Sequence, residues 1–231
     1  MKKIIVHPLP APLETDGLVV LVDILRATST IVAALAEEAL VVKPVTSIDE
    51  ALLYKEKGYL LAGERGGLPP EGFDFGNSPR EAYKMARAKV VLTTTNGTKA
   101  LGFVKKAKAI CAGSFLNLRA TAAFAHRFEE VHILCAGTEG ELSLEDFLFA
   151  GKLALLLEDY VSQNDAATVA RKYAGHVEDI SKELFASHHA IKLTKLGLEE
   201  DVAFCAQENI YDVVPILTPE GFVALKGVTE E

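Results

Sequence analysis

The sequence predicts one α/β domain built on a mostly parallel β-sheet. Short runs of aliphatic and β-branched residues at 19–22 (VVLV), 40–42 (LVV) and 90–92 (VVL) are typical of parallel strands covered on both faces. Segments of helical composition follow these runs, in the alternation that βαβ units produce. The 231 residues can bury one sizeable core and contain no linker-like tract, so we expect a single domain over residues 1–231, with room for a small second lobe.

The composition limits the partners and the compartment. The chain carries 24 basic and 32 acidic residues, a net charge of −8, which argues against nucleic acid or an anionic membrane as a partner. No apolar stretch is long enough to span a bilayer, and the opening MKKIIVHPLP turns polar too soon for a signal peptide, so we expect a cytoplasmic protein. The sparse cysteines Cys111, Cys135 and Cys205 predict reduced, mostly buried thiols rather than disulfides or a zinc site.

A first strand is expected at residues 3–6, and the strand at 19–22 then passes through a polar turn into a helix that is predicted to begin near Ser29. Ligands of α/β sheets bind beyond the carboxyl ends of the strands, where a helix N-terminus offers free N–H groups to anions. This turn therefore predicts an anion site, although a carboxylate there could only cap the helix and an arginine could only pair with a surface acid. Its candidate residues are Asp23, Arg26, Thr28, Ser29 and Thr30.

The next unit is a strand at 40–42, expected to end at Lys43-Pro44, followed by a helix over 48–57 and a strand at 59–61. The longest irregular segment comes next, GERGGLPPEGFDFGNSP at 63–79. It exceeds the usual connection of about 4–6 residues, and we interpret it as an ordered site loop anchored by Leu68, Phe73 and Phe75 rather than a flexible excursion. Its candidate binding residues are Glu64, Arg65, Gly66, Gly67, Asn77 and Ser78, with Arg80 in a helix that Pro79 opens.

A hydroxyl-rich turn, TTTNGT at 93–98, follows the strand at 90–92 and leads into a helix predicted over 99–105. This turn is compatible with plain turn chemistry, because Asn-Gly readily takes left-handed backbone angles. Hydroxyls and backbone amides followed by a lysine also suit a phosphate cradle. The candidate residues of the cradle are Thr95, Asn96, Gly97, Thr98 and Lys99.

Two further strands, AICAG at 109–113 and HILCAG at 132–137, each end in a small-residue turn. Gly137 and Thr138 of the second turn are further candidate substrate-binding residues. The helix after the first is expected to be capped by Ser114 or Asn117, and the helix after the second by Ser143. Glu145 and Asp146 then fall in a first helical turn, where acids also meet the helix dipole without any other role.

From residue 153 to about 205 the pattern is helical, with breaks at Asn164-Asp165, Gly175 and Gly197, and one or two closing strands are expected within 212–225. We assign no chemistry to the histidines of this part, which are His176, His188 and His189.

Several kinds of chemistry are disfavoured because their motifs are absent. The chain has no P-loop, no G-x-S-x-G, no H-E-x-x-H and no strand followed by G-x-G-x-x-G. These absences argue in turn against a P-loop nucleotide-binding protein, a serine hydrolase, a zinc protease and a Rossmann oxidoreductase. Carboxylates at strand ends suit Mg²⁺ acting on a phosphorylated substrate. The preferred Mg²⁺ ligands are Asp23, Glu64 and Asp146, with Asp74 and Glu145 held in reserve, and the catalytic candidates are Asp23, Arg26 and Asp146. Whether Asp23 is a metal ligand or a nucleophile stays open.

Five ordered blocks resemble the 2-phosphosulfolactate phosphatase (ComB) family: DILRATSTI, GERGG, GFDFGNSP, LTTTNGT and CAGTEGELSLED. They lie in the expected order within residues 19–151, and GLEEDVAFCAQENIYDVVP resembles the C-terminal segment of the family. The resemblance implies a three-layer α/β/α fold and Mg²⁺-dependent hydrolysis of 2-phospho-3-sulfolactate, or of a related 2-phospho-carboxylic acid, to sulfolactate in coenzyme M biosynthesis. A non-catalytic domain that binds phosphoesters with the same turns is the alternative.

The implied substrate is small and carries a phosphate, a carboxylate and a sulfonate, so several local cations must hold it. Arginine suits bidentate contacts with such oxyanions. Arg26, Arg65, Arg80 and Lys99 are the candidates. We expect Arg26 to meet the phosphoryl group and Arg80 to pair with an acid on its own helix or with Asp74. The oligomeric state is open, with a homodimer preferred.

Overall fold

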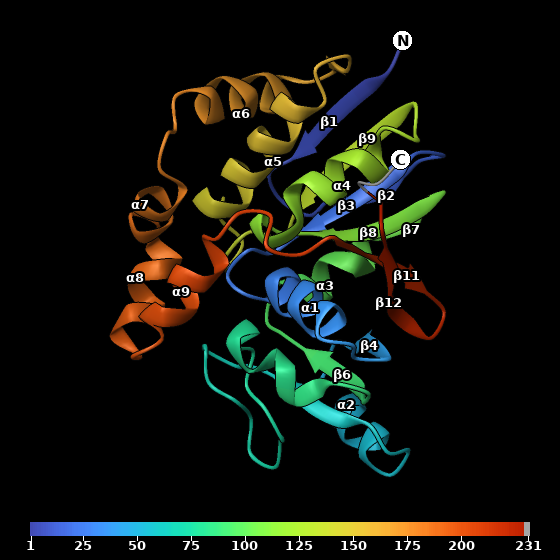
Figure 1. Ribbon diagram of the computed structural model, residues 1–231, viewed down its shortest axis with the longest axis vertical. Coiled ribbons are helices and arrows are strands. Elements are labelled where there is room, and N and C mark those ends of the chain that lie inside the picture. The colour runs from blue at the N-terminus through green and yellow to red at the C-terminus, as the bar shows by residue number, and fades with distance from the viewer. Residues whose placement is uncertain (229–231) are drawn as a thin grey trace.

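Ten strands form one sheet across residues 1–228, the part of the chain that this computed structural model describes (Figure 1). Helices flank the sheet on both faces, which confirms the predicted α/β class and is consistent with three α/β/α layers. The strands of the sheet are β1 (Lys3–His7), β3 (Leu18–Val22), β4 (Val41–Pro44), β5 (Leu60–Gly63), β6 (Lys89–Thr93), β8 (Ala109–Gly113), β9 (Glu130–Cys135), β10 (Val161–Ser162), β11 (Val213–Thr218) and β12 (Gly221–Lys226). A separate pair is formed by β2 (Leu13–Glu14) and β7 (Val104–Lys106).

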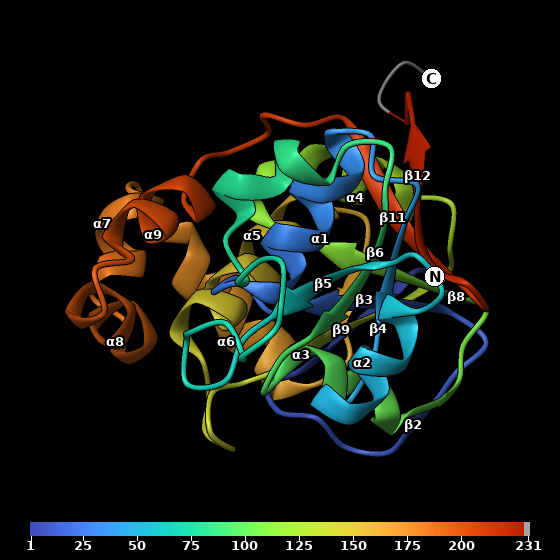
Figure 2. The same cartoon turned by 90° about the horizontal axis from the view of Figure 1, so that it is seen from below.

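The helices connect these strands and gather partly at one side of the molecule. Figures 1 and 2 both show α7, α8 and α9 together at the left, opposite the β11–β12 hairpin. The α-helices are α1 (Ala27–Ala36), α2 (Ile48–Lys55), α3 (Gly97–Ala100), α4 (Leu118–Ala125), α5 (Leu144–Leu156), α6 (Asp165–Gly175), α7 (Ile180–Phe185), α8 (His188–Lys195) and α9 (Glu199–Cys205). Three 3₁₀ turns, η1 (Pro79–Met85), η2 (Leu101–Phe103) and η3 (Phe115–Asn117), complete the helical elements of residues 1–228.

The strand order, β10-β1-β9-β3-β8-β11-β12-β4-β6-β5, divides the sheet into two parallel groups joined by the antiparallel hairpin β11–β12. The pairings β8–β11, β11–β12 and β12–β4 are all antiparallel, so β6 runs in the opposite direction to β3. Neighbouring strands rotate by roughly 20–25°, so the five steps from β3 to β6 add roughly 100–125°. The accumulated twist explains how the carboxyl ends of both strands can approach one pocket.

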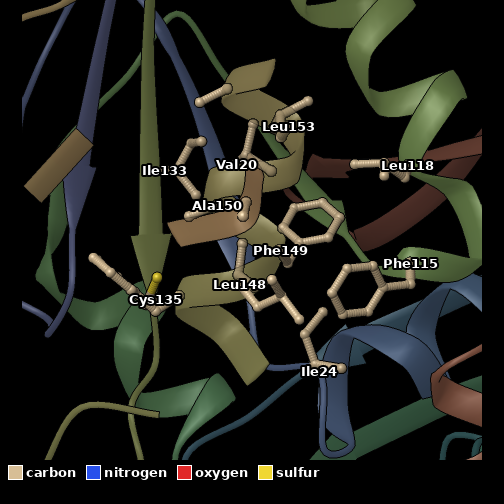
Figure 3. Packing of buried hydrophobic residues seen from close by; sticks show 14 of the residues in the cluster. Val20, Ile24, Phe115, Leu118, Ile133, Cys135, Leu148, Phe149, Ala150 and Leu153 are labelled. Atoms are coloured by element: carbon tan, nitrogen blue, oxygen red, sulfur yellow. The ribbon is translucent and has the colours of Figure 1, made fainter. Parts of the chain in front are cut away.

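β3 is buried on both faces, as its apolar run predicts. On one face Val20 packs with Phe149 of α5, and Phe115 lies against that ring at a centroid distance of 5.5 Å and an interplanar angle of 76° (Figure 3). On the other face Val19 and Leu21 pack against α1. Each such fully buried side chain contributes roughly 1.5–3 kcal/mol, so this central strand is firmly held and fixes the turn that follows it.

The helix predicted over 99–105 is wrong in its second half. The helical turn α3 ends at Ala100, η2 follows, and the chain then extends as β7. Gly102 weakens the helix, and β-branched Val104 favours the extended backbone that pairs with β2. The short strands β2, β7 and β10 were missed, because two or three residues carry no readable period.

Two predicted boundaries also move. Lys43-Pro44 was expected to end a strand, but β4 continues through Pro44. β12 pairs with β4 at Val42, so the missing N–H of Pro44 interrupts no pairing with β12. In the loop at 63–79, Phe73 and Phe75 pack against the core as predicted, whereas Leu68 is half exposed and does not anchor it.

The predicted breaks in the C-terminal helical part are confirmed. The side chain of Asn164 caps α6 by accepting from the N–H of Ala167, Gly175 ends that helix, and Gly197 follows α8 with φ 74°. The chain closes with the two strands β11 and β12. Every helix within residues 1–228 is too short or too polar to cross a bilayer.

Candidate active site

A pocket of about 230 Å³ lies between the turns that follow β3, β5, β6 and β9 and one face of α8. Asp23 and Asn96, which are candidates from two different turns, both line it, and Thr138 next to Gly137 lines it too. The full lining is Asp23, Leu25, Arg26, Glu64, Gly66, Gly67, Asn77, Thr94, Thr95, Asn96, Thr138, Glu139, His189, Lys192, Leu193 and Leu196. Residues that follow different strands of the sheet therefore lie at one pocket.

The turn after β3 places the Asp23 carboxylate at the pocket wall. Its Oδ1 accepts from the N–H of Ala27 at 3.3 Å, and its Oδ2 lies where a Cβ on Gly97 would come within 2.6 Å. The Leu25–Arg26 peptide bond of this turn is cis. Gly97 therefore allows the close approach of α3 to Asp23.

The three hydroxyls of this turn face the protein interior rather than the pocket. Thr28 and Ser29 donate back to the carbonyls of Asp23 and Ile24 at 2.9 and 2.8 Å, and Thr30 donates to the carbonyl of Asn77 at 3.1 Å. The helix begins at Ala27, with Arg26 as the N-cap residue and no side-chain cap, so the start predicted near Ser29 is wrong. The hydroxyls fix the turn and are not free to bind a ligand.

Arg26 is already occupied by protein partners. Its guanidinium forms a buried ion pair with Asp201 of α9 and donates to the carbonyl of Gly67 at 2.7 Å. Because the side chain also lines the pocket, Arg26 forms part of the wall while holding α9 and the loop at 63–79 in place.

Glu64 organises the loop around the pocket. Its Oε1 accepts from the N–H of Thr95 at 2.7 Å and its Oε2 from the N–H of Gly67 at 2.9 Å, which links the turns after β5 and β6. The neighbouring Arg65 donates to the carbonyl of Glu64 and to Thr93 Oγ1, and it does not line the pocket. A Cβ on Gly67 would approach Leu196 to 2.8 Å, so this loop packs directly on the end of α8.

Two polar atoms in the pocket wall are buried without a protein partner. They are Thr95 Oγ1 and Asn77 Oδ1. Buried polar groups are nearly always satisfied, so these two atoms indicate a polar ligand or ordered water in the pocket. Thr98, in contrast, donates to the carbonyl of Thr94 at 2.9 Å and only stabilises the turn.

Asp146 lies beneath the pocket and ties two turns together. Its carboxylate accepts from the N–H of Ile24 at 2.8 Å and from the N–H of Gly137 at 3.2 Å. This one residue of α5 therefore fixes the turn after β3 against the turn after β9. Both of its oxygens are engaged by backbone amides.

His189 and Lys192 of α8 are functional candidates that the sequence reasoning missed. The ring Nδ1 of His189 lies 3.3 Å from Oε1 of Glu145 and 3.2 Å from Thr138 Oγ1, so Nε2 is the nitrogen available to a ligand. Lys192 forms an ion pair with Glu139 at 2.7 Å. One signal was available: His189, Lys192 and Leu196 recur at helical spacing, so a histidine and a lysine share an otherwise apolar helix face.

The remaining candidates lie outside the pocket lining. Arg80 pairs with Glu200 of α9 at 2.5 Å, not with an acid of its own helix or with Asp74. Asp74 instead accepts from the N–H of Leu61, and Ser78 donates to Asp201. Lys99 lines an adjoining pocket beside Phe103, which shares Thr95, Asn96 and Glu139 with the main pocket.

The buried acids repel one another. Burial raises the pKa of Asp23 to about 6, with further upward contributions from the charges of Glu64 and Glu145 and an opposing one from His189. Burial and the charges of Asp23 and Glu145 raise the pKa of Asp146 well above its usual range. Burial also opposes ionisation of Glu145, but contact with His189 outweighs it and lowers that pKa.

These carboxylates fit a magnesium ion only in a limited way. Within residues 1–228 no three His, Cys, Asp or Glu side chains gather into a complete metal site. Mg²⁺ needs no such cage, because it takes one or two carboxylates and keeps waters or substrate phosphate oxygens. Asp23 and Glu64 line the pocket, and their mutual repulsion is the kind that a divalent cation relieves.

Comparison with known proteins gives a consistent result over almost the whole chain. The profile of a family described as 2-phosphosulpholactate phosphatase matches residues 5–220. A probable 2-phosphosulfolactate phosphatase of Pseudothermotoga lettingae is 41% identical over 217 residues, covering 93% of this chain and 96% of that protein. A probable 2-phosphosulfolactate phosphatase of Thermus thermophilus is 42% identical, covering 89% and 90%. The 2-phosphosulfolactate phosphatase of Methanothermobacter thermautotrophicus is 38% identical, covering 88% of each chain. This chain therefore belongs to the 2-phosphosulfolactate phosphatase family.

Proposed function

We propose that this protein is a Mg²⁺-dependent phosphatase that hydrolyses 2-phospho-3-sulfolactate, or a related 2-phospho-carboxylic acid, to sulfolactate and phosphate. Membership of the family supports the reaction class and the substrate. The observation that carries the proposal is that Asp23 and His189, whose ring lies beside the buried Glu145, line one pocket from separate elements. A carboxylate and an oriented imidazole are the groups that phosphoester hydrolysis requires for charge stabilisation and proton transfer.

The phosphoryl group is proposed to lie against the turn after β6, beside Asp23. Thr95 Oγ1 is buried there without a partner and can donate to a phosphoryl oxygen. Asn96 lines the same part of the pocket. Gly66 and Gly67, with φ 61° and 89°, let the backbone of the opposite loop approach closely.

Asp23 and Glu64 would hold the magnesium ion, which when bound would neutralise charge on the phosphoryl oxygens and orient the reacting groups. Asp146 is proposed as a positioning residue, since its two amide contacts set the backbone on either side of Asp23.

In the proposed hydrolysis a water oxygen forms the new bond to phosphorus while the bond to the C2 oxygen breaks, and His189 is proposed to donate the proton that this leaving oxygen needs. Nδ1 of His189 lies 3.2 Å from Thr138 Oγ1 and 3.3 Å from the buried carboxylate of Glu145, so we assign the transferable proton to Nε2. Positioned general acids of this kind contribute roughly 10²–10⁴-fold to rate.

The test is phosphate release by the purified chain from 2-phospho-3-sulfolactate, with Mg²⁺ and after chelation. We expect turnover that chelation abolishes and Mg²⁺ restores, and that Asp23→Asn removes. The exposed acid Asp16, which pairs with Lys106 far from the pocket, provides the control variant Asp16→Asn. Binding without phosphate release would instead support the non-catalytic phosphoester-binding alternative.

The setting of this reaction is part of the same proposal. We propose that the reaction serves coenzyme M biosynthesis, as the family resemblance implies. The three cysteines are free and buried, which supports a reducing, cytoplasmic location. A small anionic substrate remains the expected partner, with a homodimer as the preferred assembly.

A further inference from the structure

We propose that Lys192 binds the sulfonate of the substrate and is the residue that selects sulfonated over plain 2-phospho-carboxylic acids. This role rests on the proposed phosphatase function and names the group that recognises the distinguishing part of the substrate.

Three side chains that can carry positive charge line the pocket: Arg26, His189 and Lys192. The partners of the first two are buried, since Asp201 is 3% exposed and Glu145 is 1% exposed. Glu139, the partner of Lys192, is 70% exposed, and Lys192 itself is 52% exposed.

This difference in burial decides which cation can turn to a ligand. Separating a buried ion pair disfavours the folded or bound state by more than about a hundredfold, because it strands a desolvated charge. An exposed pair contributes about fivefold or less, and its released carboxylate returns to water. Lys192 can therefore exchange Glu139 for a substrate anion at little cost, whereas Arg26 and His189 cannot leave their partners.

The position of Lys192 suits the far end of the substrate. Lys192 and Glu139 line both the main pocket and an adjoining pocket of about 400 Å³ beside Ser143 and Ser187, whereas Asp23 lines only the main one. The phosphoryl oxygen is attached to C2 and the sulfonate to C3, so the two anions point in different directions. With the phosphoryl group at Asp23, the sulfonate reaches the boundary between the pockets.

Glu139 acts as the competitor for this cation in the unliganded protein. Its backbone takes a left-handed φ of 56°, inside a turn closed by reciprocal hydrogen bonds between Thr138 and Glu141 at 2.9 and 3.0 Å. This turn presents the carboxylate to Lys192, and the hydrogen bond from Lys192 lowers the pKa of Glu139. The carboxylate is thus ionised and occupies the place we assign to the sulfonate.

The first experiment compares three phosphoesters: 2-phospho-3-sulfolactate, 2-phospholactate, and the phosphate ester of 2-hydroxypropane-1-sulfonate, which lacks the carboxylate. Lys192→Met should lower kcat/KM by about tenfold for the two sulfonated esters and leave 2-phospholactate nearly unchanged. Lys195→Met is the matched control, since Lys195 is exposed at the end of the same helix and lines neither pocket. Equal losses on all three esters, or losses that follow the carboxylate, would overturn the assignment.

In a second variant we expect stronger rather than weaker binding of the sulfonated esters. Glu139→Gln removes the competing charge, so KM for the sulfonated esters should fall by about two- to fivefold, with kcat retained. A merely structural ion pair would give losses in both variants, which contradicts the proposed exchange.

Binding of the product separates this inference from the proposed function, because binding needs no turnover. Calorimetric titration with sulfolactate should show about tenfold weaker binding to Lys192→Met than to the unmodified chain, and lactate should show no such difference. Equal sulfolactate affinities, or no binding to the unmodified chain, would refute the role of Lys192 even if phosphatase activity is present. Preserved discrimination in binding without any phosphate release would refute only the phosphatase function.

Discussion

The guanidinium of Arg26 forms an ion pair with the carboxylate of Asp201, and both side chains are only 3% exposed. Arg26 also donates to the carbonyl of Gly67, while Asp201 accepts from Ser78 Oγ at 2.6 Å. The pair thus joins the turn after β3, the long loop and α9 around one side of the pocket. Its main effect is to fix the wall against which the substrate lies.

Replacing Asp201 by Ala should strongly destabilise the protein, because the buried guanidinium keeps its charge and loses its partner. We expect a loss of about 3–5 kcal/mol in the free energy of unfolding, measured by urea denaturation. Glu200→Ala in the adjacent exposed pair with Arg80 is the control and should cost less than about 1 kcal/mol. Similar losses in the two variants would contradict the importance of burial.

Replacing His189 by Asn should lower kcat for 2-phospho-3-sulfolactate by roughly 10²–10⁴-fold, because Asn cannot donate the proton. Glu145→Gln should cost about tenfold, since it weakens a charge-assisted contact but keeps the volume. His188→Asn is the control, because His188 is exposed and absent from the main pocket lining. Near-normal kcat in His189→Asn would rule out the proposed proton donor.

The residues of the site divide according to how they could be predicted. Asp23 and Glu64 follow apolar strands directly and Asn96 lies in the turn after β6. The end of a parallel strand is a local feature that one stretch of sequence reveals. His189 and Lys192 come from a helix whose packing over those strand ends depends on contacts far apart in the chain. The local sequence around His189 and Lys192 gives little indication of that packing.

The hydroxyls of Thr28, Ser29 and Thr30 show a different limit. Three successive hydroxyl residues fit both an anion site and a turn held by its own hydrogen bonds. In the structure they donate to nearby carbonyls. The fold class was predictable for the opposite reason. Alternation of buried strands with helices is repeated along the whole chain, so errors such as the helix at 99–105 do not alter it.

Replacing Gly97 by Ala should disturb the site through Asp23. A Cβ at this position would lie 2.6 Å from Asp23 Oδ2 and 2.8 Å from the Cβ of Ala27, both tighter than real contacts allow. We expect a loss of about 1–3 kcal/mol in stability and a marked fall in Mg²⁺ affinity, measured by urea unfolding and calorimetry. Gly102→Ala, where an added Cβ would meet no atom within 4 Å, is the control. Unchanged Mg²⁺ affinity in Gly97→Ala would argue against Asp23 as a ligand.

His7 lies beside a second histidine, with its Nε2 2.9 Å from Nδ1 of His132. Burial and the charge of His132 lower the pKa of His7 from 6.5 to about 4. The other ring nitrogen of His132 contacts Glu130 Oε1 at 2.9 Å, which extends the network along β9. Between pH 6.5 and pH 4 the unfolded chain therefore binds a proton at His7 that the folded chain does not.

Stability should accordingly fall as the pH drops through this window and should be unaffected by His7 above it. From pH 7.5 to pH 5 the contribution is roughly 2 kcal/mol, since about 1.5 pH units lie below the unfolded pKa. His7→Gln keeps a hydrogen-bonding group beside His132 but cannot titrate. Between pH 7.5 and pH 5 the variant should therefore lose roughly 2 kcal/mol less stability than the unmodified protein. Urea unfolding of both proteins at pH 7.5 and pH 5 measures the difference and cancels the groups that they share. Equal losses in the two proteins would show that His7 does not resist protonation in the folded state.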